Sequence, residues 1–172
     1  RVSNEQGVKY QLNSDVKSIK VKGSEVEIRF CPSDITQKIE IFDMCFICAG
    51  VSSHRFAKML GDKVNIYPVK GYSITLQLPN AISQKKAPKV SILYNEAKIV
   101  TSRLGKHWFS VAGTAEISGH NLDILDAHIK PLKKWVEQNF SEVSTKDEQR
   151  WLVLRPMMPH MMPLISQGKK TF

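Results

Sequence analysis

One charged residue, Arg155, lies within a largely apolar stretch near the end of the chain, WLVLRPMMPHMMPLI at residues 151–165. A guanidinium is always ionised, and burying it is costly unless its N–H donors meet a partner such as a carboxylate. Its planar fork can bind a carboxylate through two charge-assisted hydrogen bonds. Arg155 is therefore a candidate carboxylate-binding residue, whether that carboxylate is structural or belongs to a substrate.

Other residue types that perform chemistry form weaker patterns. Glu116, in GTAEISG, is a candidate acid or base, although a carboxylate on an edge strand is the commoner outcome. No two glycines are separated by a single residue, so the chain has no G-x-G-x-x-G phosphate-binding loop. The histidines form no ligand or nucleophile motif, and we interpret them as surface or packing residues: His54, His107, His120, His128 and His160.

The cysteines do not form the pattern of a disulfide framework or of a metal site. Cys45 and Cys48 spell C-x-x-C, but they lie in an apolar stretch typical of a strand, where residues three apart face opposite sides. No second pair completes four zinc ligands. With Cys31 the number is odd, which favours a reducing compartment and buried thiols over a redox or metal role.

Composition indicates an ordinary globular protein of 172 residues, 42% hydrophobic and 24% charged, with one domain or one and a fraction. The net charge is +9, but the lysines are spread along the chain, which favours a solvated basic surface over a nucleic-acid interface. No apolar run approaches the roughly 20 residues that span a bilayer. The chain begins with Arg and has no leader, so we expect a soluble, cytoplasmic piece of a longer protein.

The first part of the chain reads as short strands and a helix. Apolar and polar residues alternate over residues 7–30, which predicts two or three strands in a meander. FDMCFICAG, residues 42–50, is apolar without alternation, as in a strand covered on both faces of a parallel sheet. VSSHRFAKMLG predicts a short helix capped by Ser52 or Ser53 and ending at Gly61.

After residue 63 the pattern is typical of an antiparallel sheet. Three segments rich in strand-forming residues are separated by turn signals at Pro79-Asn80, Asn95 and Gly105-Lys106. Apolar residues spaced three and four apart over residues 121–140 predict a helix, which Pro131 should kink or restart near its first turn. RWLVLRP predicts a final strand.

Four segments in this order resemble the FAD-dependent D-amino-acid oxidase superfamily, and most closely its bacterial D-amino-acid dehydrogenase branch of the small-subunit type. The segments are FDMCFICAGVSS, YPVKGYSITLQLP, VAGTAEISGHN and WLVLRPMMPHMMPLI. The resemblance extends over nearly the whole chain and places it in the middle to late part of a longer protein.

The resemblance implies an α+β fold with two interlocked parts. One is an antiparallel-sheet substrate domain with flanking helices, and the other is part of a Rossmann-like FAD-binding domain. We expect residues 1–62 to belong to the FAD-binding domain and residues 63–148 to the substrate domain. Residues 149–172 would contain the strand that returns toward the flavin site.

The resemblance also implies roles for individual residues. Arg155, the arginine of a leucine-arginine-proline motif, would grip the α-carboxylate of the substrate. Tyr72 is a weaker candidate for lining the substrate site. Ala49 and Gly50 would contact FAD at the end of their strand, and Val16 would lie near the adenine. No metal site is implied.

The parent enzyme would oxidatively deaminate a D-amino acid to a 2-oxo acid and ammonia, with hydride transfer to FAD. The electrons would leave to a membrane acceptor. Peripheral association with the inner membrane therefore stays open. The chain alone we expect to be inactive and without bound FAD. The alternative is a non-catalytic remnant or self-associating domain without cofactor, and a homo-oligomer is compatible with either interpretation.

Overall fold

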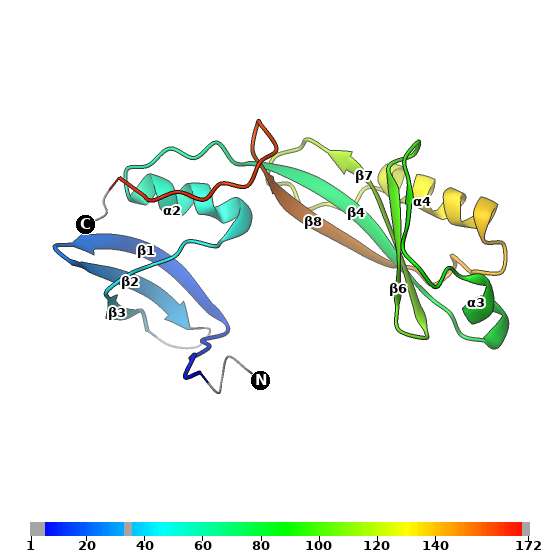
Figure 1. The fold of residues 1–172 in the computed structure, drawn as a ribbon, viewed down its shortest axis with the longest axis horizontal. Coiled ribbons are helices and arrows are strands. Elements are labelled where there is room, and N and C mark those ends of the chain that lie inside the picture. Colours follow the sequence, from blue (N-terminus) through cyan, green and yellow to red (C-terminus); the bar gives the residue numbers. More distant parts are fainter. Residues whose placement is uncertain (1–5, 33–35, 170–172) are drawn as a thin grey trace. The chain divides into compact units, whose positions relative to one another are not determined.

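The computed structural model describes residues 6–32 and 36–169. The described part of the chain forms two compact units (Figure 1). The first unit combines residues of the range 1–66 with residues of the range 158–172, and the second comprises Tyr67–Met157. Within the described residues, no helix is long and apolar enough to cross a membrane.

The first unit contains a three-stranded antiparallel sheet in the order β1-β2-β3. Its strands are β1 (Ser14–Lys22), β2 (Glu25–Pro32) and β3 (Lys38–Phe42). The two-residue turn between β1 and β2 places Gly23 at a φ of +59°, a conformation that glycine adopts without steric cost. Ile19 and Val26 pack with Phe56 of helix α2 (Ser53–Met59) in a small core. The meander and the short helix predicted from the sequence are confirmed.

The predicted strand over residues 42–50 is wrong. Only Phe42 belongs to a strand; residues 43–49 are irregular, and a 3₁₀ turn follows at Gly50–Ser52. Met44 and Phe46 are 68% and 83% exposed instead of covered on both faces. A parallel strand needs hydrogen-bonded neighbours, and no described strand of this chain pairs with residues 43–49.

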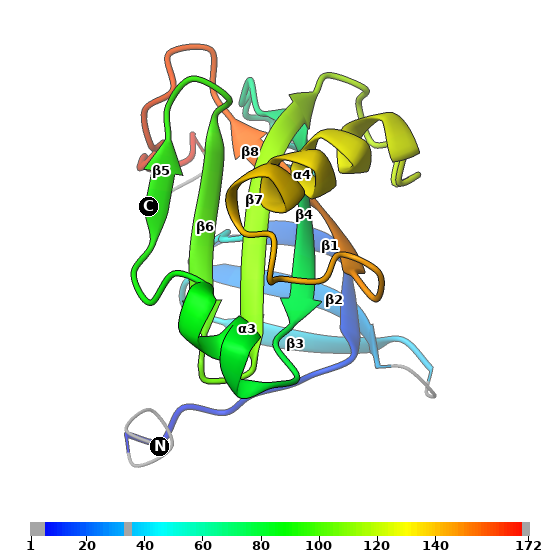
Figure 2. The ribbon, with the colours of Figure 1, turned by 90° about the vertical axis from the view of Figure 1, so that its right-hand side faces the viewer.

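The second unit is built on a five-stranded antiparallel sheet in the order β5-β6-β7-β4-β8 (Figure 2). This confirms the antiparallel pattern predicted after residue 63 and the final strand. The turns predicted at Asn95 and Gly105 connect the neighbouring strands. The strands are β4 (Tyr67–Gln77), β5 (Ile92–Tyr94), β6 (Ile99–Leu104), β7 (Trp108–Glu116) and β8 (Gln149–Met157).

Helix α4 (Asp126–Asn139) covers one face of this sheet and crosses β4 and β7 (Figure 2). Its residues Ile129, Leu132 and Val136 are spaced three and four apart, so they lie on one helix face, and each is at most 1% exposed. They pack with apolar residues of β4 and β7: Tyr72, Ile74, Leu76, Phe109 and Val111. We call this side of the sheet the packed face.

Two predictions about helices need correction. The helix expected over residues 121–140 begins at Asp126, so Leu122 and Leu125 precede its first turn and are 65% and 44% exposed. Pro131 lies inside one continuous helix and does not restart it. A second helix, α3 (Ala81–Lys86), follows Asn80, where only a turn was predicted.

Side-chain capping explains the start of α3 but not that of α2. The side chain of Asn80 accepts a hydrogen bond of 2.8 Å from the backbone N–H of Ser83, and Ser83 reciprocates, which forms a capping box at the start of α3. Ser52 makes no side-chain capping bond to α2, contrary to one of the predicted alternatives. The hydroxyl of Ser53 instead accepts a hydrogen bond of 3.1 Å from the backbone N–H of Ala49.

Candidate functional site

The face of the five-stranded sheet opposite α4 carries mostly small or apolar side chains. In β4, alternate residues point to opposite sides, and the regular pairing of β4 with β8 extends that alternation to β8. We call this side the open face, and Trp151 and Val153 on it are 56% and 55% exposed. Its central residues are Val69, Gly71, Ser73 and Thr75 of β4, Ser110, Ala112 and Ala115 of β7, and Trp151, Val153 and Arg155 of β8.

Arg155 is the one charged side chain in this set, and it lies near the end of β8. Its register partner in β4 is Val69, and its guanidinium extends diagonally across the neighbouring Gly71. Within the described ranges, no carboxylate forms an ion pair with it. An exposed guanidinium without a carboxylate partner, on an otherwise uncharged face, retains its fork of donors for a ligand.

Tyr72 does not share the open face with Arg155. It is 1% exposed, and its ring stacks on the ring of His128 in α4 with a centroid distance of 4.7 Å and an interplanar angle of 17°. Its hydroxyl donates a hydrogen bond to the Glu116 carboxylate. Tyr72 is thus part of the packed face, and its position does not support a role in lining a site on the open face.

A buried ion pair accompanies Tyr72. The Lys70 side chain is fully buried, and its Nζ lies 3.1 Å from Glu116 and donates hydrogen bonds to Asn121 Oδ1 at 2.9 Å and to the Asp123 carbonyl at 3.2 Å. Burial alone would lower the pKa of Lys70, but its interactions with Glu116 and Tyr72 outweigh burial and raise that pKa.

The same contacts decide the protonation state of the Glu116 carboxyl group. The hydrogen bond from Tyr72, followed by the interaction with Lys70, lowers the pKa of the Glu116 carboxyl. Glu116 is therefore an ionised structural partner in the packed face, which favours the structural interpretation over the acid–base one. Sequence reasoning missed Lys70, although its alternation with Tyr72 and Ile74 in β4 placed it on the buried side.

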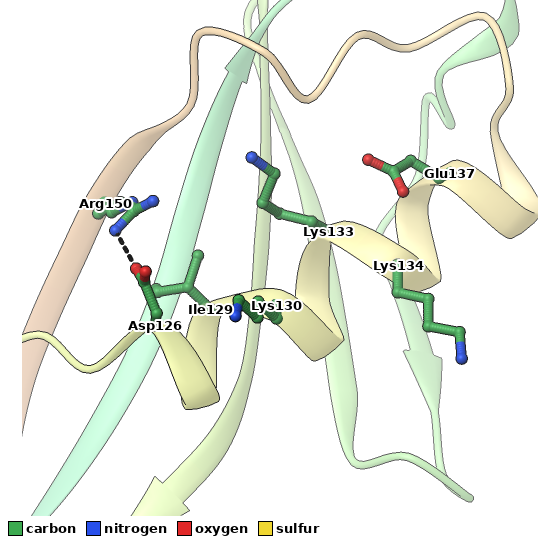
Figure 3. A pocket seen from close by; sticks show the side chains of 7 residues that line it. All are labelled: Asp126, Ile129, Lys130, Lys133, Lys134, Glu137 and Arg150. Atoms are coloured by element: carbon green, nitrogen blue, oxygen red, sulfur yellow. Dashed lines mark hydrogen bonds and ion pairs between the residues drawn. The ribbon is translucent and has the colours of Figure 1, made fainter.

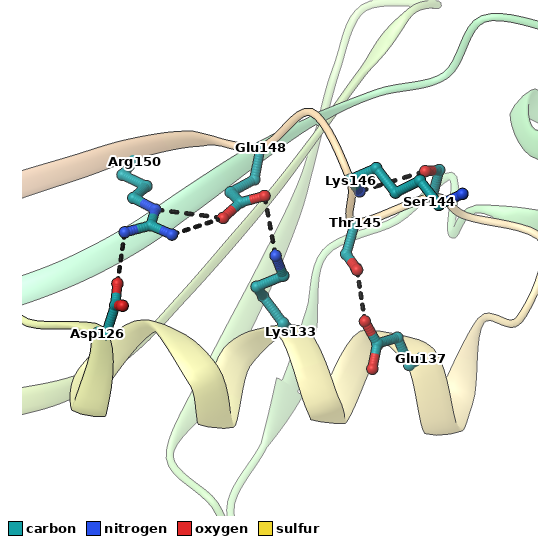
Figure 4. A network of polar contacts seen from close by, with 8 residues as sticks. All are labelled: Asp126, Lys133, Glu137, Ser144, Thr145, Lys146, Glu148 and Arg150. Carbon is teal, nitrogen blue, oxygen red and sulfur yellow. Dashed lines mark hydrogen bonds and ion pairs between the residues drawn. The ribbon is translucent and has the colours of Figure 1, made fainter.

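A hollow of about 260 Å³ between α4 and β8 is lined by four cationic and two carboxylate side chains, of which Arg150 and Asp126 form an ion pair (Figure 3). Arg150 of β8 pairs with Asp126 at 2.6 Å and with Glu148 at 3.1 Å, and Lys133 pairs with Glu148 at 3.0 Å (Figure 4). Burial would raise the pKa of Glu148, but the hydrogen bonds from Lys133 and Arg150 lower it overall. We interpret this network as a clamp that fastens α4 to β8.

The predicted cofactor contacts lie in the first unit. Val16 and Ala49 line the same apolar hollow of about 370 Å³, with Ile19, Ile28, Cys45, Phe46, Ile47, Cys48 and Phe56. Gly50 follows Ala49 with a φ of +55°, and a Cβ built on it would meet no atom within 4 Å. The structure thus brings Val16 and Ala49 together and places Gly50 next in the chain.

The cysteines around this hollow differ in their environments. Burial raises the pKa of the Cys45 thiol, which is half-buried, whereas Cys48 is exposed. The expectation of buried thiols is therefore wrong for Cys48. That expectation assumed a covered strand, which residues 43–49 do not form. No group of three or more metal-ligating side chains occurs among the described residues.

Comparison with known sequences identifies relatives over most of the chain. The family model for FAD dependent oxidoreductase (DAO) matches residues 1–172. The chain is 48% identical over 139 residues to D-amino acid dehydrogenase 3 of Mesorhizobium japonicum, covering 81% of this chain and 34% of that protein. It is 33% identical over 165 residues to D-amino acid dehydrogenase of Dechloromonas aromatica, covering 95% of this chain and 38% of that protein. The chain thus spans a little over one third of these relatives.

Solved structures with low sequence identity share the fold. Glycine oxidase from Geobacillus kaustophilus superposes with a TM-score of 0.75 at 12% identity, over 91% of this chain and 40% of that one. L-proline dehydrogenase from P. horikoshii gives a TM-score of 0.75 at 12% identity, over 96% of this chain and 43% of that one. These likenesses agree with the predicted α+β class, which the antiparallel sheets and helices confirm. By its family match and its named relatives, the chain belongs to the family of FAD dependent oxidoreductases (DAO).

Proposed function

We propose that the chain supplies the substrate-binding sheet and part of the cofactor site of a D-amino-acid dehydrogenase. The observation that carries this proposal is the guanidinium of Arg155, which lies on the open face without a carboxylate partner among the described residues. The names of the relatives from Mesorhizobium japonicum and Dechloromonas aromatica support the substrate class.

The proposed reaction removes a hydride from Cα and a proton from the amino group of a D-amino acid. The resulting imine takes up water and releases ammonia, which leaves a 2-oxo acid. FAD, when bound, supplies the acceptor for the hydride. The protein's own contribution is to bind and orient the substrate, because positioning can account for much of the acceleration of such a step.

Arg155 orients the substrate through its carboxylate. The fork makes two parallel charge-assisted hydrogen bonds, which fix both the position and the plane of the carboxylate and hence the direction of the Cα–H bond. Around it, Gly71 has no side chain and those of Ser73 and Ala115 are small, so the open face leaves room for the rest of the substrate. No acidic side chain in the set defining this face competes for the guanidinium.

The first unit contains residues that fit part of a flavin cofactor. The apolar hollow lined by Val16 and Ala49 suits a flat aromatic ring, and the open space at Gly50 permits close approach of a ligand to the backbone. We propose that Val16, Ala49 and Gly50 hold a portion of FAD. The pyrophosphate needs a glycine turn and a helix N-terminus, and the 172 residues contain no such glycine motif.

A chimaera tests the proposed function. This chain would replace the matching part of the Mesorhizobium japonicum relative, and turnover of D- and L-amino acids would be followed with an artificial electron-accepting dye. We expect reduction of the dye with D-amino acids and formation of the 2-oxo acid, and no turnover with the L-enantiomers. A chimaera that binds flavin stoichiometrically but oxidises no D-amino acid would reject the proposal.

A further inference from the structure

We infer that Gly71 is a positioning residue for Arg155, because its lack of a side chain provides the space in which the guanidinium lies. This inference deepens the proposed function and rests on it for the identity of the ligand, a substrate carboxylate. Its structural part, the dependence of the Arg155 side chain on Gly71, can be measured separately.

With the guanidinium in its observed place, a side chain at position 71 would be too close to it. A Cβ built on Gly71 would lie 2.9 Å from Nε, 3.1 Å from Cζ and 3.1 Å from Nη2 of Arg155. These three atoms belong to the planar group itself, not to its aliphatic stem. Real Cβ atoms essentially never lie closer than 3.0 Å to a neighbour of this kind, so the contact at 2.9 Å requires one partner to move.

The backbone of β4 is the partner that cannot move. Strand β4 is hydrogen-bonded to β7 on one side and to β8 on the other. The residues that flank Gly71 in the chain, Lys70 and Tyr72, are 0% and 1% exposed and anchor the strand in the packed face. The guanidinium, at the end of a long and exposed side chain, is therefore the group that a Cβ would displace.

Such a displacement affects binding much more than folding. Rotation of the Arg155 side chain costs little, because its end is exposed and makes no ion pair with the described residues. A bidentate contact, in contrast, depends on the plane and position of the fork.

Gly113 provides a matched control on the neighbouring strand. A Cβ at Gly113 would lie 3.0 Å from Ile99 Cγ1 and 3.0 Å from Leu132 Cδ2, so it meets the packed face instead of Arg155. Gly113→Ala should therefore lower the melting temperature and leave carboxylate binding unchanged. Gly71→Ala should weaken carboxylate binding and leave the melting temperature nearly unchanged.

The experiment has two independent measurements. In the 172-residue chain, the ¹H–¹⁵N signal of the Arg155 Nε–H group, assigned by its loss in Arg155→Lys, reports the position of the guanidinium. In the flavin-loaded chimaera, KM for D-amino acids and inhibition by simple carboxylates report binding. We expect Gly71→Ala to shift the signal and to raise KM and the inhibition constants at least about tenfold, with a smaller change in kcat.

The outcomes separate this inference from the proposed function. An Arg155 signal and a KM that both stay unchanged in Gly71→Ala would overturn the positioning role. A signal that shifts equally in Gly113→Ala would also overturn it, because the effect would then be a general loosening of the sheet. If the unsubstituted chimaera oxidises no D-amino acid while the signal still responds only to Gly71→Ala, the proposed function fails and the positioning of Arg155 stands.

Discussion

Tyr72 and Arg155 lie on opposite faces of the same five-stranded sheet. Tyr72 contacts His128 and Glu116 in the packed face, whereas the guanidinium of Arg155 extends over Gly71 on the open face. The thickness of one sheet therefore separates a residue that supports the fold from one that is available to a ligand. Substitutions on the two faces should consequently change different measured quantities.

For the open face, we expect Arg155→Lys in the chimaera to reduce kcat/KM by roughly two orders of magnitude or more, because an ammonium cannot reproduce a bidentate fork. Steady-state kinetics with a D-amino acid measure the effect. Arg150→Lys is the matched control, since Arg150 lies on the same strand but belongs to the clamp with Asp126. Near-normal kinetics of Arg155→Lys would reject the carboxylate-binding assignment.

For the packed face, we expect Leu132→Ala to destabilise the second unit by about 2–5 kcal/mol, the usual cost of removing a buried leucine side chain. Leu132 is 0% exposed, whereas Leu122 is 65% exposed outside the helix. Leu122→Ala should therefore change the free energy of unfolding by less than about 0.5 kcal/mol. Urea unfolding followed by circular dichroism compares the two variants, and equal losses would contradict the observed start of α4.

The buried ion pair predicts a pH dependence. The folded-state pKa of Glu116 is depressed below its ordinary value of 4.5, so its contribution to stability is complete above that pH and is lost as the pH falls through the folded-state pKa. Glu116→Gln should lower the melting temperature at about pH 7. It should also make the melting temperature fall less steeply as the pH is lowered toward about pH 3. Glu142→Gln, an exposed carboxylate of the same unit, should leave the decline unchanged.

Cofactor binding by the 172-residue chain can be tested directly. We expect no measurable retention of FAD, because Val16, Ala49 and Gly50 supply only a fraction of the contacts and no glycine-rich phosphate loop is present in the sequence. The purified chain should be colourless, and equilibrium dialysis against FAD should give no stoichiometric uptake. A yellow preparation with one flavin per chain would contradict this expectation.

The exposed segment at residues 43–49 predicts self-association of the 172-residue chain. Met44 and Phe46 are 68% and 83% exposed, and Ile41 of the neighbouring strand β3 is 59% exposed. Exposed apolar side chains on an edge strand and in the segment that follows it favour contact with a second copy. Size-exclusion chromatography with light scattering should give a mass above 19.5 kDa, and Phe46→Ser should shift it toward the monomer. A monomeric mass for the unsubstituted chain would refute the association.

Local patterns predicted much of the fold. Alternation and turn residues located β4, β6, β7 and β8, because these signals act within a few residues. The spacing of Ile129, Leu132 and Val136 identified the buried side of α4. The strand predicted at residues 42–50 failed because an apolar run is compatible with several environments, and pairing with other strands decides between them.

The candidate site was harder to predict, since it depends on pairing between distant strands. Residue type alone singled out Arg155, but its contact with Gly71 follows from the register of β8 against β4. The environment of Glu116 depends on a β-bulge in β7, where Thr114 has a φ of +52° and interrupts the alternation. Strict two-residue alternation along β7 would put Glu116 on the face opposite Lys70, so the sequence pattern does not predict their contact.

The open face also contains fluorophores. Of the three tryptophans in the chain, Trp151 lies on this face and Trp108 projects to the same side, whereas Trp135 packs against the core of the packed face. Trp151 is 56% exposed, so its emission is that of an indole largely in water. Any molecule that covers the open face removes this water and shifts the emission to shorter wavelength. Intrinsic fluorescence therefore monitors occupancy of this face without an added label.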